Sequence, residues 1–464
     1  MKNGTRRYAA VLLLLAVAAC NDFLTGDKLS SDPNQPQTAN RYLLLNGVQA
    51  QQFTNLTGAA ARAFGIFTQQ FAGTDRQYGL LEVYAFTGDD YTSTFNGTYA
   101  SGGLVDIRKI EDDARAAGDR IFLGVAQVWE AIDMGNAATL WGDIPYREAA
   151  NASIANPHFD PEAQVYGDVQ QLLDSAIANL TTNQGLGPQA YDLIYGASGS
   201  STASVQKWVA AAHTLKARYY MHLAEKDPSN YAKAIAQANL GIMDPKNDFT
   251  TYQSTTPGEE NLWWQFSVRD RDTYIRANAT LVDLMKSRND PRLPNYFAPN
   301  AKDSIVGSPP GGKEQSASTL SALRASPDFR QPLITAAENL LIRAEAKYQT
   351  GDATAINDLN TVRGFYGLPA IVATGPALLR AIAEEEYVAL FQNIEVMALY
   401  SRTCYPNITP TDGGSNVPRR LYYGTDERNA NPNTPASENL FNSTDKAGGT
   451  VNAAGSCLGQ AAGG

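Results

Sequence analysis

The residue types that most often carry catalysis are sparse in this chain of 464 residues. Its histidines are His158, His213 and His222, and the last two lie nine positions apart in one predicted helix, which is the wrong spacing for two metal ligands on one face. The sequence contains no H-E-x-x-H, G-x-S-x-G or G-x-G-x-x-G pattern and no phosphate-binding glycine loop. We therefore expect structural or surface histidines, no metal, no cofactor, no catalytic residue and no enzyme.

A run of three carboxylates, Glu384, Glu385 and Glu386, is the strongest hint of hydrolytic chemistry. A glycosidase needs two carboxyl groups facing each other across a sugar, about 5 to 9.5 Å apart. Consecutive helical residues point in different directions, so this run does not supply such a pair. We expect it to place favourable charge in the first turns of a helix that starts near Pro376. A glycosidase built from distant acids stays open as an alternative.

Two segments without a sustained helical period, residues 73–103 and 244–331, are rich in groups that bind sugars. Aromatic rings can stack on a sugar face, while carboxylate, amide and guanidinium groups bond its hydroxyls, and binding residues concentrate on loops carried by a rigid scaffold. The two adjacent tryptophans should face opposite ways in an extended segment, so that one is core and the other is exposed. The candidate ligand residues are Asp75, Arg76, Tyr78, Tyr84, Asp89, Asp90, Tyr91, Asn96 and Tyr99 in the first segment, and Trp263, Trp264, Arg269, Asp270, Arg271, Tyr274 and Asn278 in the second.

The first cysteine, Cys20, follows a basic start, an apolar run over residues 9–17 and two small alanines. This order is typical of a secretory signal peptide, and the run is too short to span a membrane. With the cysteine directly after Val-Ala-Ala, the site resembles the lipobox of bacterial lipoproteins. The resemblance implies cleavage after residue 19 and lipid such as palmitate on Cys20, with residues 20–39 as anchor and tether. An ordinary signal peptide with a coincidental cysteine is the alternative.

Cys404 and Cys457 remain as a pair in an oxidising compartment. A disulfide between them and two unrelated thiols are equally compatible with the sequence.

The charge of the chain excludes some partners. Loss of residues 1–19 leaves 445 residues and changes the formal net charge from −10 to −13, because the leader carries three basic residues and no acid. An acidic chain without a basic stripe argues against nucleic acid, and no polybasic patch offers a second attachment to a membrane.

Helical periodicity predicts that the chain is mainly all-α. Helices are expected over 104–140, 161–180, 203–224, 229–242, 332–349, 352–366 and 376–400, while 401–464 should be loop-rich. Asp160 before a proline predicts a helix N-cap, and Gly351 with Asp352 predicts a turn between paired helices. Small alanines in these pairs, such as Ala212, Ala217, Ala344 and Ala346, predict TPR-like hairpins about 104–242 and 332–400. An irregular α-bundle is the alternative.

The motif Trp141-Gly-Asp-Ile-Pro-Tyr146 predicts a tight corner at which aromatic rings close over the core. WGDIPYREA at 141–149 also resembles a signature of the SusD/RagB family of outer-membrane nutrient-binding lipoproteins. Further blocks resemble that family in the same order, although Ser401, Cys404 and Gly424 replace its usual arginine, glycine and proline, and the tail from Ser437 does not match. The other blocks are DPNQP at 32–36, AAAHTLKARYYMHLA at 210–224, LLIRAEAKYQTGD at 340–352, INDLNTVRGFYGL at 356–368, EEEYVALFQNIEVMALYSRTCYPNITP at 384–410 and VPRRLYYGTDERNAN at 417–431.

The resemblance implies one SusD-like domain over 40–464, in which TPR-like hairpins form a scaffold and irregular segments carry the ligand surface. It implies a lipid-anchored protein of the outer membrane, exposed at the cell surface, that partners a SusC-like TonB-dependent β-barrel transporter. The expected ligand is an oligosaccharide or polysaccharide, with a peptide as the alternative within the same system.

Overall fold

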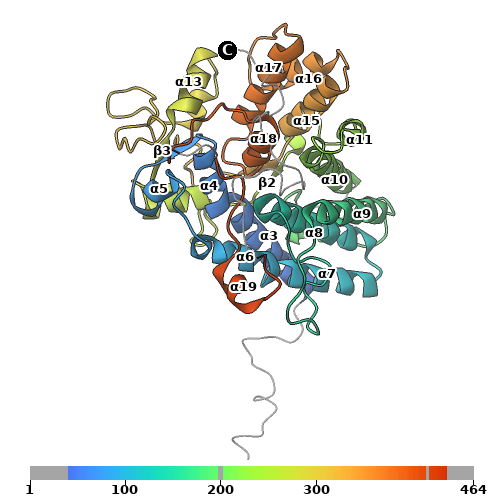
Figure 1. Ribbon diagram of the computed structural model, residues 1–464. Helices are drawn as coiled ribbons and strands as arrows, with labels where there is room; N and C mark the ends of the chain where they lie inside the picture. The colour runs from blue at the N-terminus through green and yellow to red at the C-terminus, as the bar shows by residue number, and fades with distance from the viewer. Residues whose placement is uncertain (1–39, 197–201, 414–416, 436–464) are drawn as a thin grey trace, which may run out of the picture.

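Helices make up most of the computed structural model, which describes residues 40–196, 202–413 and 417–435 (Figure 1). The predicted fold class, mainly all-α, is confirmed. The helices are α3 (Arg41–Thr57), α4 (Ala59–Phe67), α5 (Arg76–Leu81), α6 (Thr92–Tyr99), α7 (Leu104–Ala116), α8 (Arg120–Trp141), α9 (Glu162–Leu180), α10 (Thr202–His222), α11 (Ser229–Ala238), α12 (Leu262–Trp264), α13 (Ala279–Ser287), α14 (Leu293–Tyr296), α15 (Ala336–Gln349), α16 (Ala355–Phe365), α17 (Gly375–Ala389), α18 (Glu395–Thr403) and α19 (Thr425–Ala430).

Two short antiparallel strand pairs accompany the helices. β1 (Phe71–Gly73) pairs with β3 (Ile275–Ala277), and β2 (Phe249–Thr250) pairs with β4 (Pro332–Ile334). The first pair joins the two segments predicted to carry ligand residues, although they lie about two hundred positions apart in the chain. None of the helices in the described part of the chain is long and apolar enough to cross a membrane.

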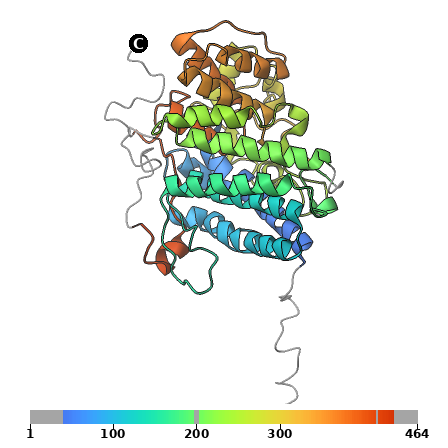
Figure 2. The same cartoon turned by 90° about the vertical axis from the view of Figure 1, so that its right-hand side faces the viewer.

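The helices α7 to α11 and α15 to α17 stack in layers along one side of the molecule (Figure 2). Successive members pack on one another, and the predicted hairpins near 203–242 and 332–366 correspond to α10 with α11 and α15 with α16. Small residues allow the close approach: a Cβ on Gly135 of α8 would lie 2.2 Å from Cζ of Tyr219 on α10. Ala217 and Ala346 are fully buried where α10, α11 and α15 meet. This side is the scaffold.

The corner at 141–146 closes the core as predicted. The Trp141 indole nitrogen donates to the carbonyl oxygen of Tyr422 at 3.0 Å, and its ring meets Phe95 edge to face at 5.0 Å between centroids. The Tyr146 hydroxyl donates to Glu130 at 2.9 Å. These contacts join α6, α8 and the C-terminal segment, so the motif has a structural role here.

The cap predicted for α9 is wrong in its residue. Asp160 accepts hydrogen bonds from the backbone N–H groups of Tyr146 and Arg147, at 3.0 and 2.8 Å, and so holds the corner. The N-terminus of α9 is bonded by the corner in return, because Asp143 accepts from the backbone N–H of Glu162 at 2.8 Å. Asp143 therefore supplies the bond to the start of α9 that local sequence assigned to Asp160.

Two further expectations are corrected. Residues 73–103 contain α5, α6 and a 3-10 turn at Gly88–Tyr91 in place of loops or strands, and α13 and α14 interrupt the second segment. The run Glu384–Glu386 lies in the last turns of α17, not its first. Glu385 has no exposed side chain and accepts from Arg292 at 2.7 Å, while Glu386 accepts from Arg402 at 2.7 Å. These buried pairs fasten the second segment and α18 to α17.

Candidate ligand-binding site

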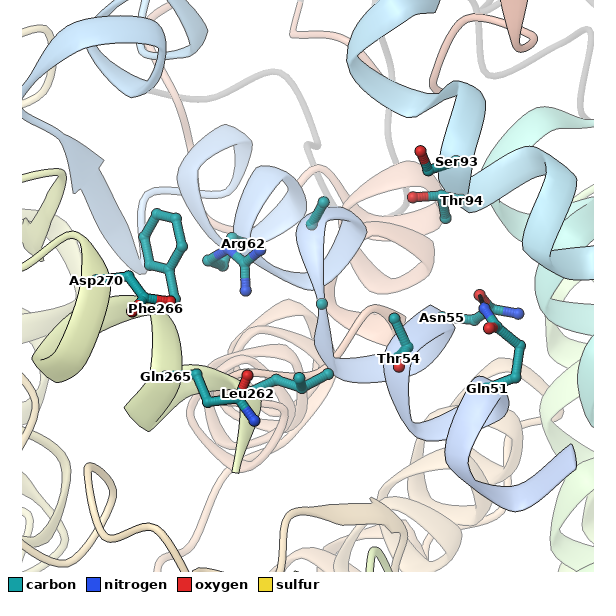
Figure 3. A pocket seen from close by; sticks show the side chains of 12 residues that line it. Gln51, Thr54, Asn55, Arg62, Ser93, Thr94, Leu262, Gln265, Phe266 and Asp270 are labelled. Carbon is teal, nitrogen blue, oxygen red and sulfur yellow. Dashed lines mark hydrogen bonds between the residues drawn. The ribbon is translucent and has the colours of Figure 1, made fainter. Parts of the chain in front are cut away.

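A pocket of about 310 Å³ lies where α3 and α4, α6, and the segment from α12 into a π-helix at Gln265–Asp270 come together (Figure 3). A volume of this size is at the lower end of the range that small ligands occupy. It is lined by Gln51, Thr54, Asn55, Gly58, Ala59, Arg62, Ser93, Thr94, Leu262, Gln265, Phe266 and Asp270.

One wall is a polar stripe on α3. Gln51, Thr54 and Asn55 share a face because they are three and four positions apart, and the Gln51 amide donates to the Asn55 side-chain oxygen at 2.8 Å. Ser93 and Thr94 on α6 face the stripe across the pocket (Figure 3). These amides and hydroxyls can both donate and accept hydrogen bonds, as recognition of a hydroxylated ligand requires.

The chain bends between α3 and α4, and this bend shapes the pocket. The backbone N–H of Gly58 donates to the carbonyl oxygen of Thr54 at 3.0 Å, and a Cβ on Gly58 would lie 2.4 Å from that oxygen. No larger residue fits there without a shift of the backbone. The glycine therefore lets α4 start directly behind the polar stripe and bring Arg62 to the opposite end of the pocket.

That end is built from an arginine and aromatic rings. The Arg62 guanidinium carbon lies 4.1 Å from the ring centroid of Phe266, and its Nε donates to the Tyr78 hydroxyl at 2.8 Å. The Tyr78 and Phe266 rings are 4.8 Å apart. The guanidinium is thus fixed in one plane, because the phenylalanine supports its face and the tyrosine oxygen bonds its inner edge.

The one carboxylate in the lining, Asp270, is held by its neighbour Arg269. Two hydrogen bonds join them, from Nε at 2.8 Å and from one terminal nitrogen at 3.0 Å, and the bond lowers the pKa of the Asp270 carboxyl. Arg269 in turn lies 5.7 Å from the Trp264 ring. Asp270, Arg269 and Trp264 therefore form a rim on which the carboxylate is ionised and already paired.

Several predicted ligand residues are buried in the protein. Trp263 has no exposed surface and packs on Phe71 at 4.9 Å, and Asn278 is fully buried and caps α13 by accepting from the Thr280 N–H at 3.0 Å. Tyr91 is 3% exposed and meets Phe86 edge to face. Each of the three serves the core or a helix end and none of them lines the pocket, so ligand contact by these residues stays a prediction. The expectation that one of the two tryptophans is core is confirmed by Trp263.

Other predicted residues are half-buried or tied to neighbours. Tyr84 meets Phe67 edge to face, and burial raises its pKa to about 12, while Tyr99 packs against Phe95 at 5.3 Å. The Asp75 carboxylate accepts from the Thr273 hydroxyl at 2.6 Å, which lowers its pKa.

The remaining predicted residues lie on the surface or at the rim. Asn96 donates to Asp426 at 3.1 Å, and Arg271 lies 5.2 Å from the Tyr274 ring. Arg76 is exposed, as are Asp89 and Asp90. Asp270 alone among all the predicted residues lines the pocket.

Four of the lining residues lie on helices to which the sequence analysis assigned no ligand residue. Gln51, Thr54, Asn55 and Arg62 belong to α3 and α4, and a polar stripe next to a helix-interrupting glycine was the available signal. A second hollow of about 550 Å³ contains Lys207, Lys246 and Arg330 but no amide side chain, and no predicted ligand residue lines it.

The three histidines and Cys404 are all bonded to neighbouring groups. His158 bonds Glu148, His213 bonds Gln237, and His222 lies between Tyr166 and Glu395. Within the described ranges no group of three or more histidine, cysteine or acidic side chains could hold a metal ion. Cys404 is disulfide-bonded. Cys20 and Cys457 lie outside the described residues, so lipidation of the first and pairing of the second stay predictions.

Comparison with known proteins finds a matching family model and solved structures with a similar fold. A family model named SusD-like and described as "starch-binding associating with outer membrane" matches residues 33–424. A SusD/RagB family protein from Bacteroides thetaiotaomicron is 21% identical, with a TM-score of 0.71 over 86% of this chain and 95% of its own. A chitin-binding SusD homolog from Flavobacterium johnsoniae is 19% identical, with a TM-score of 0.71 over 85% of this chain and 97% of its own. At these identities the similarity shows the shared fold. No curated protein matches the chain.

Proposed function

This chain belongs to the SusD-like family, and we propose that it is a lipid-anchored protein of the bacterial outer membrane that captures a glycan and delivers it to a SusC-like TonB-dependent transporter. The family as a whole is associated with the outer membrane and with carbohydrate binding. The leader of the chain, with Cys20 directly after two small alanines, supports attachment by lipid. The specific partner and ligand belong to the proposal.

The pocket between α3, α6 and the π-helix carries the proposal. It offers amides and hydroxyls on one side and the Phe266 ring on the other, which suits a ligand that has both hydroxyl groups and an apolar ring face. Arg62 and Asp270 are the charged residues in its lining. Both segments predicted to bind sugar contribute to the pocket. Residues 73–103 contribute Ser93 and Thr94, and residues 244–331 contribute Gln265 and Phe266.

The same lining supports a proposal of binding without hydrolysis. Hydrolysis of a glycosidic bond by two carboxyl groups needs both of them across the sugar, and the lining supplies Asp270 alone. Asp270 is also engaged by Arg269, which favours its charged form and makes it a poor proton donor. The pocket therefore supports capture, in which the ligand leaves unchanged.

A glycan array followed by calorimetric titration tests the proposal on the full chain. We expect at least one oligosaccharide to bind and to be recovered intact. The double change Gln51→Ala with Asn55→Ala should weaken that binding about ten-fold or more, because two hydrogen-bonding amides are removed from one wall. Gln171→Ala, an exposed amide on the scaffold helix α9, is the matched control and should bind normally.

The other outcomes decide between classes of function. Shortened products would favour a glycosidase. Binding of peptides and of no glycan would favour the peptide-capturing alternative, and an unchanged affinity in the double variant would remove this pocket from the proposal.

A further inference from the structure

Arg62 is a positive charge that pairs with no acidic side chain in the described part of the protein. Its Nε bonds the neutral Tyr78 hydroxyl, and its face lies on Phe266. Among the described residues no carboxylate forms an ion pair with Arg62, and no protein hydrogen bond engages its two terminal nitrogens. The contrast with Asp270 is clear, because that carboxylate already receives two hydrogen bonds from Arg269. The lining therefore carries one compensated negative charge and one uncompensated positive charge.

The Arg62 guanidinium is held in an orientation that suits bidentate binding of an oxyanion. Stacking on Phe266 fixes its plane, and the bond from Nε to Tyr78 fixes its rotation, so the two terminal nitrogens have a set direction before a ligand arrives. Figure 3 shows the Arg62 side chain directed into the open space enclosed by α3, α6 and the π-helix. A planar pair of N–H donors matches the two oxygens of a carboxylate or the oxygens of a sulfate.

Resting on the proposed function, we propose that this pocket selects acidic glycans, and that Arg62 is the residue that determines the selection. A uronate carboxylate or a sulfate ester would accept two hydrogen bonds from the Arg62 terminal nitrogens. Neighbouring hydroxyls of the sugar would meet Gln51 and Asn55 on one side and Ser93 and Thr94 on the other. Phe266 would contribute an apolar floor beneath the arginine.

The charge of the whole molecule makes a local cation necessary. The formal net charge is −10, so an acidic glycan is repelled by the average field of the protein. That field is screened beyond roughly 8 Å at physiological salt, whereas an ion pair inside a pocket is screened much less. Discrimination in favour of an acid therefore has to come from a contact in the pocket, and Arg62 provides the geometry for it.

The test compares oligosaccharides that differ in charge alone. Oligogalacturonate and hyaluronan oligomers are titrated beside their methyl esters, which keep the same linkages. κ-Carrageenan oligomers, which carry sulfate esters and no uronate, are titrated beside desulfated ones. For at least one pair we expect the charged member to bind the full chain about ten-fold or more tightly, because it alone can accept a charge-assisted bidentate bond from Arg62. Preference for the uronates or for the sulfate identifies which oxyanion Arg62 binds.

Three variants assign the preference to Arg62. Arg62→Gln should abolish the difference between the charged and uncharged members, and Arg62→Lys should restore part of it. Arg115→Gln removes an exposed charge on α7 outside the lining and should leave the difference intact. If Arg62→Gln does not fold, Thr54→Glu places a negative charge on the facing wall at an exposed position and should reduce the preference while leaving the arginine stack in place.

The inference and the proposed function fail in different ways. Neutral glycans bound as tightly as their acidic counterparts, or a preference that persists in both Arg62→Gln and Thr54→Glu, would overturn the inference and leave glycan capture standing. A chain that binds no glycan of either kind would overturn both.

Discussion

Trp263 and Trp264 are neighbours in the sequence but occupy different environments. Trp263 is fully buried against Phe71, whereas Trp264 is half-buried at the rim beside Arg269. Trp263→Ala should lower the free energy of unfolding by about 3–5 kcal/mol, because it leaves a large cavity in the core. Trp264→Ala should change it by less than about 1 kcal/mol. Urea denaturation of both variants measures the difference, and equal losses would contradict the assignment.

Glu82 is a buried carboxyl that should make the free energy of unfolding depend on pH. Its two oxygens accept from the backbone N–H groups of Gly73 and Gly311 at 2.7 and 2.8 Å, yet burial raises its pKa to about 7. Between about pH 4.5 and 7 the folded state holds a proton that the unfolded state has lost. Stability contributed by the neutral carboxyl is therefore present below pH 4.5 and is lost as the pH rises through 7.

Glu82→Gln tests this sign. Urea denaturation of the wild type between pH 5 and 8 should show a fall in unfolding free energy, to which Glu82 contributes at most about 1.4 kcal/mol per pH unit. The variant should have a shallower slope, and Glu314→Gln, at an exposed position nearby, should keep the wild-type slope. Identical slopes in Glu82→Gln and wild type would show that Glu82 does not titrate in this range.

At the scale of elements, the bend between α3 and α4 couples the fold to the pocket. Gly58→Ala should destabilise the protein by about 1–3 kcal/mol, because the added methyl group meets the Thr54 carbonyl oxygen. It should also weaken ligand binding, since Arg62 and the α3 stripe lie on opposite sides of the bend. Gly47→Ala in α3 is the control, because a Cβ there has no neighbour within 4 Å and should be neutral or stabilising. Thermal unfolding and titration of both variants separate the effects, and a Gly58→Ala protein as stable as Gly47→Ala would refute the argument.

The scaffold helices were predictable because their signals are local. α10, α11, α15 and α16 have sustained helical periods, buried alanines and, at Gly351, a residue with φ of 77° in the turn. The short helices in 73–103 were missed because their glycine, threonine and tyrosine residues have weak helix propensity, and packing against α3 and the C-terminal segment overrides it. The α9 cap failed for a related reason: Asp160 is within reach of a more distant backbone at the corner.

The site was only partly predictable because it is assembled from distant segments. Phe266 and Arg62 are about two hundred positions apart, and their contact depends on the packing of the π-helix against α4. Composition singled out the segments 73–103 and 244–331, and both contribute residues to the pocket lining. Composition does not separate that lining from neighbouring core residues such as Trp263. The polar stripe on α3 was visible in the sequence, whereas the surface it faces was not.

At the scale of the whole molecule, the layered helices α7 to α11 and α15 to α17 occupy one side (Figure 1). The pocket lies among α3, α4, α6 and the π-helix, and α3 packs on α7 and α8 of that layer. Attachment of this body to the membrane is expected at Cys20. Cys20→Ala should leave the protein soluble or retained as a precursor, because the lipid acceptor is lost. Membrane fractionation measures this, and unchanged membrane association would refute the anchor.

Gentle detergent extraction of the wild type should bring down a large β-barrel protein, and consistent recovery of the chain alone would count against the transporter partnership.

A crystal structure of the full chain with an oligosaccharide that binds it tests the central claim most directly. We expect sugar density between α3, α6 and the π-helix, with hydroxyls bonded to Gln51 and Asn55 and a ring near Phe266. Density in the hollow beside Tyr252 and Arg330, with the α3 pocket empty, would contradict it.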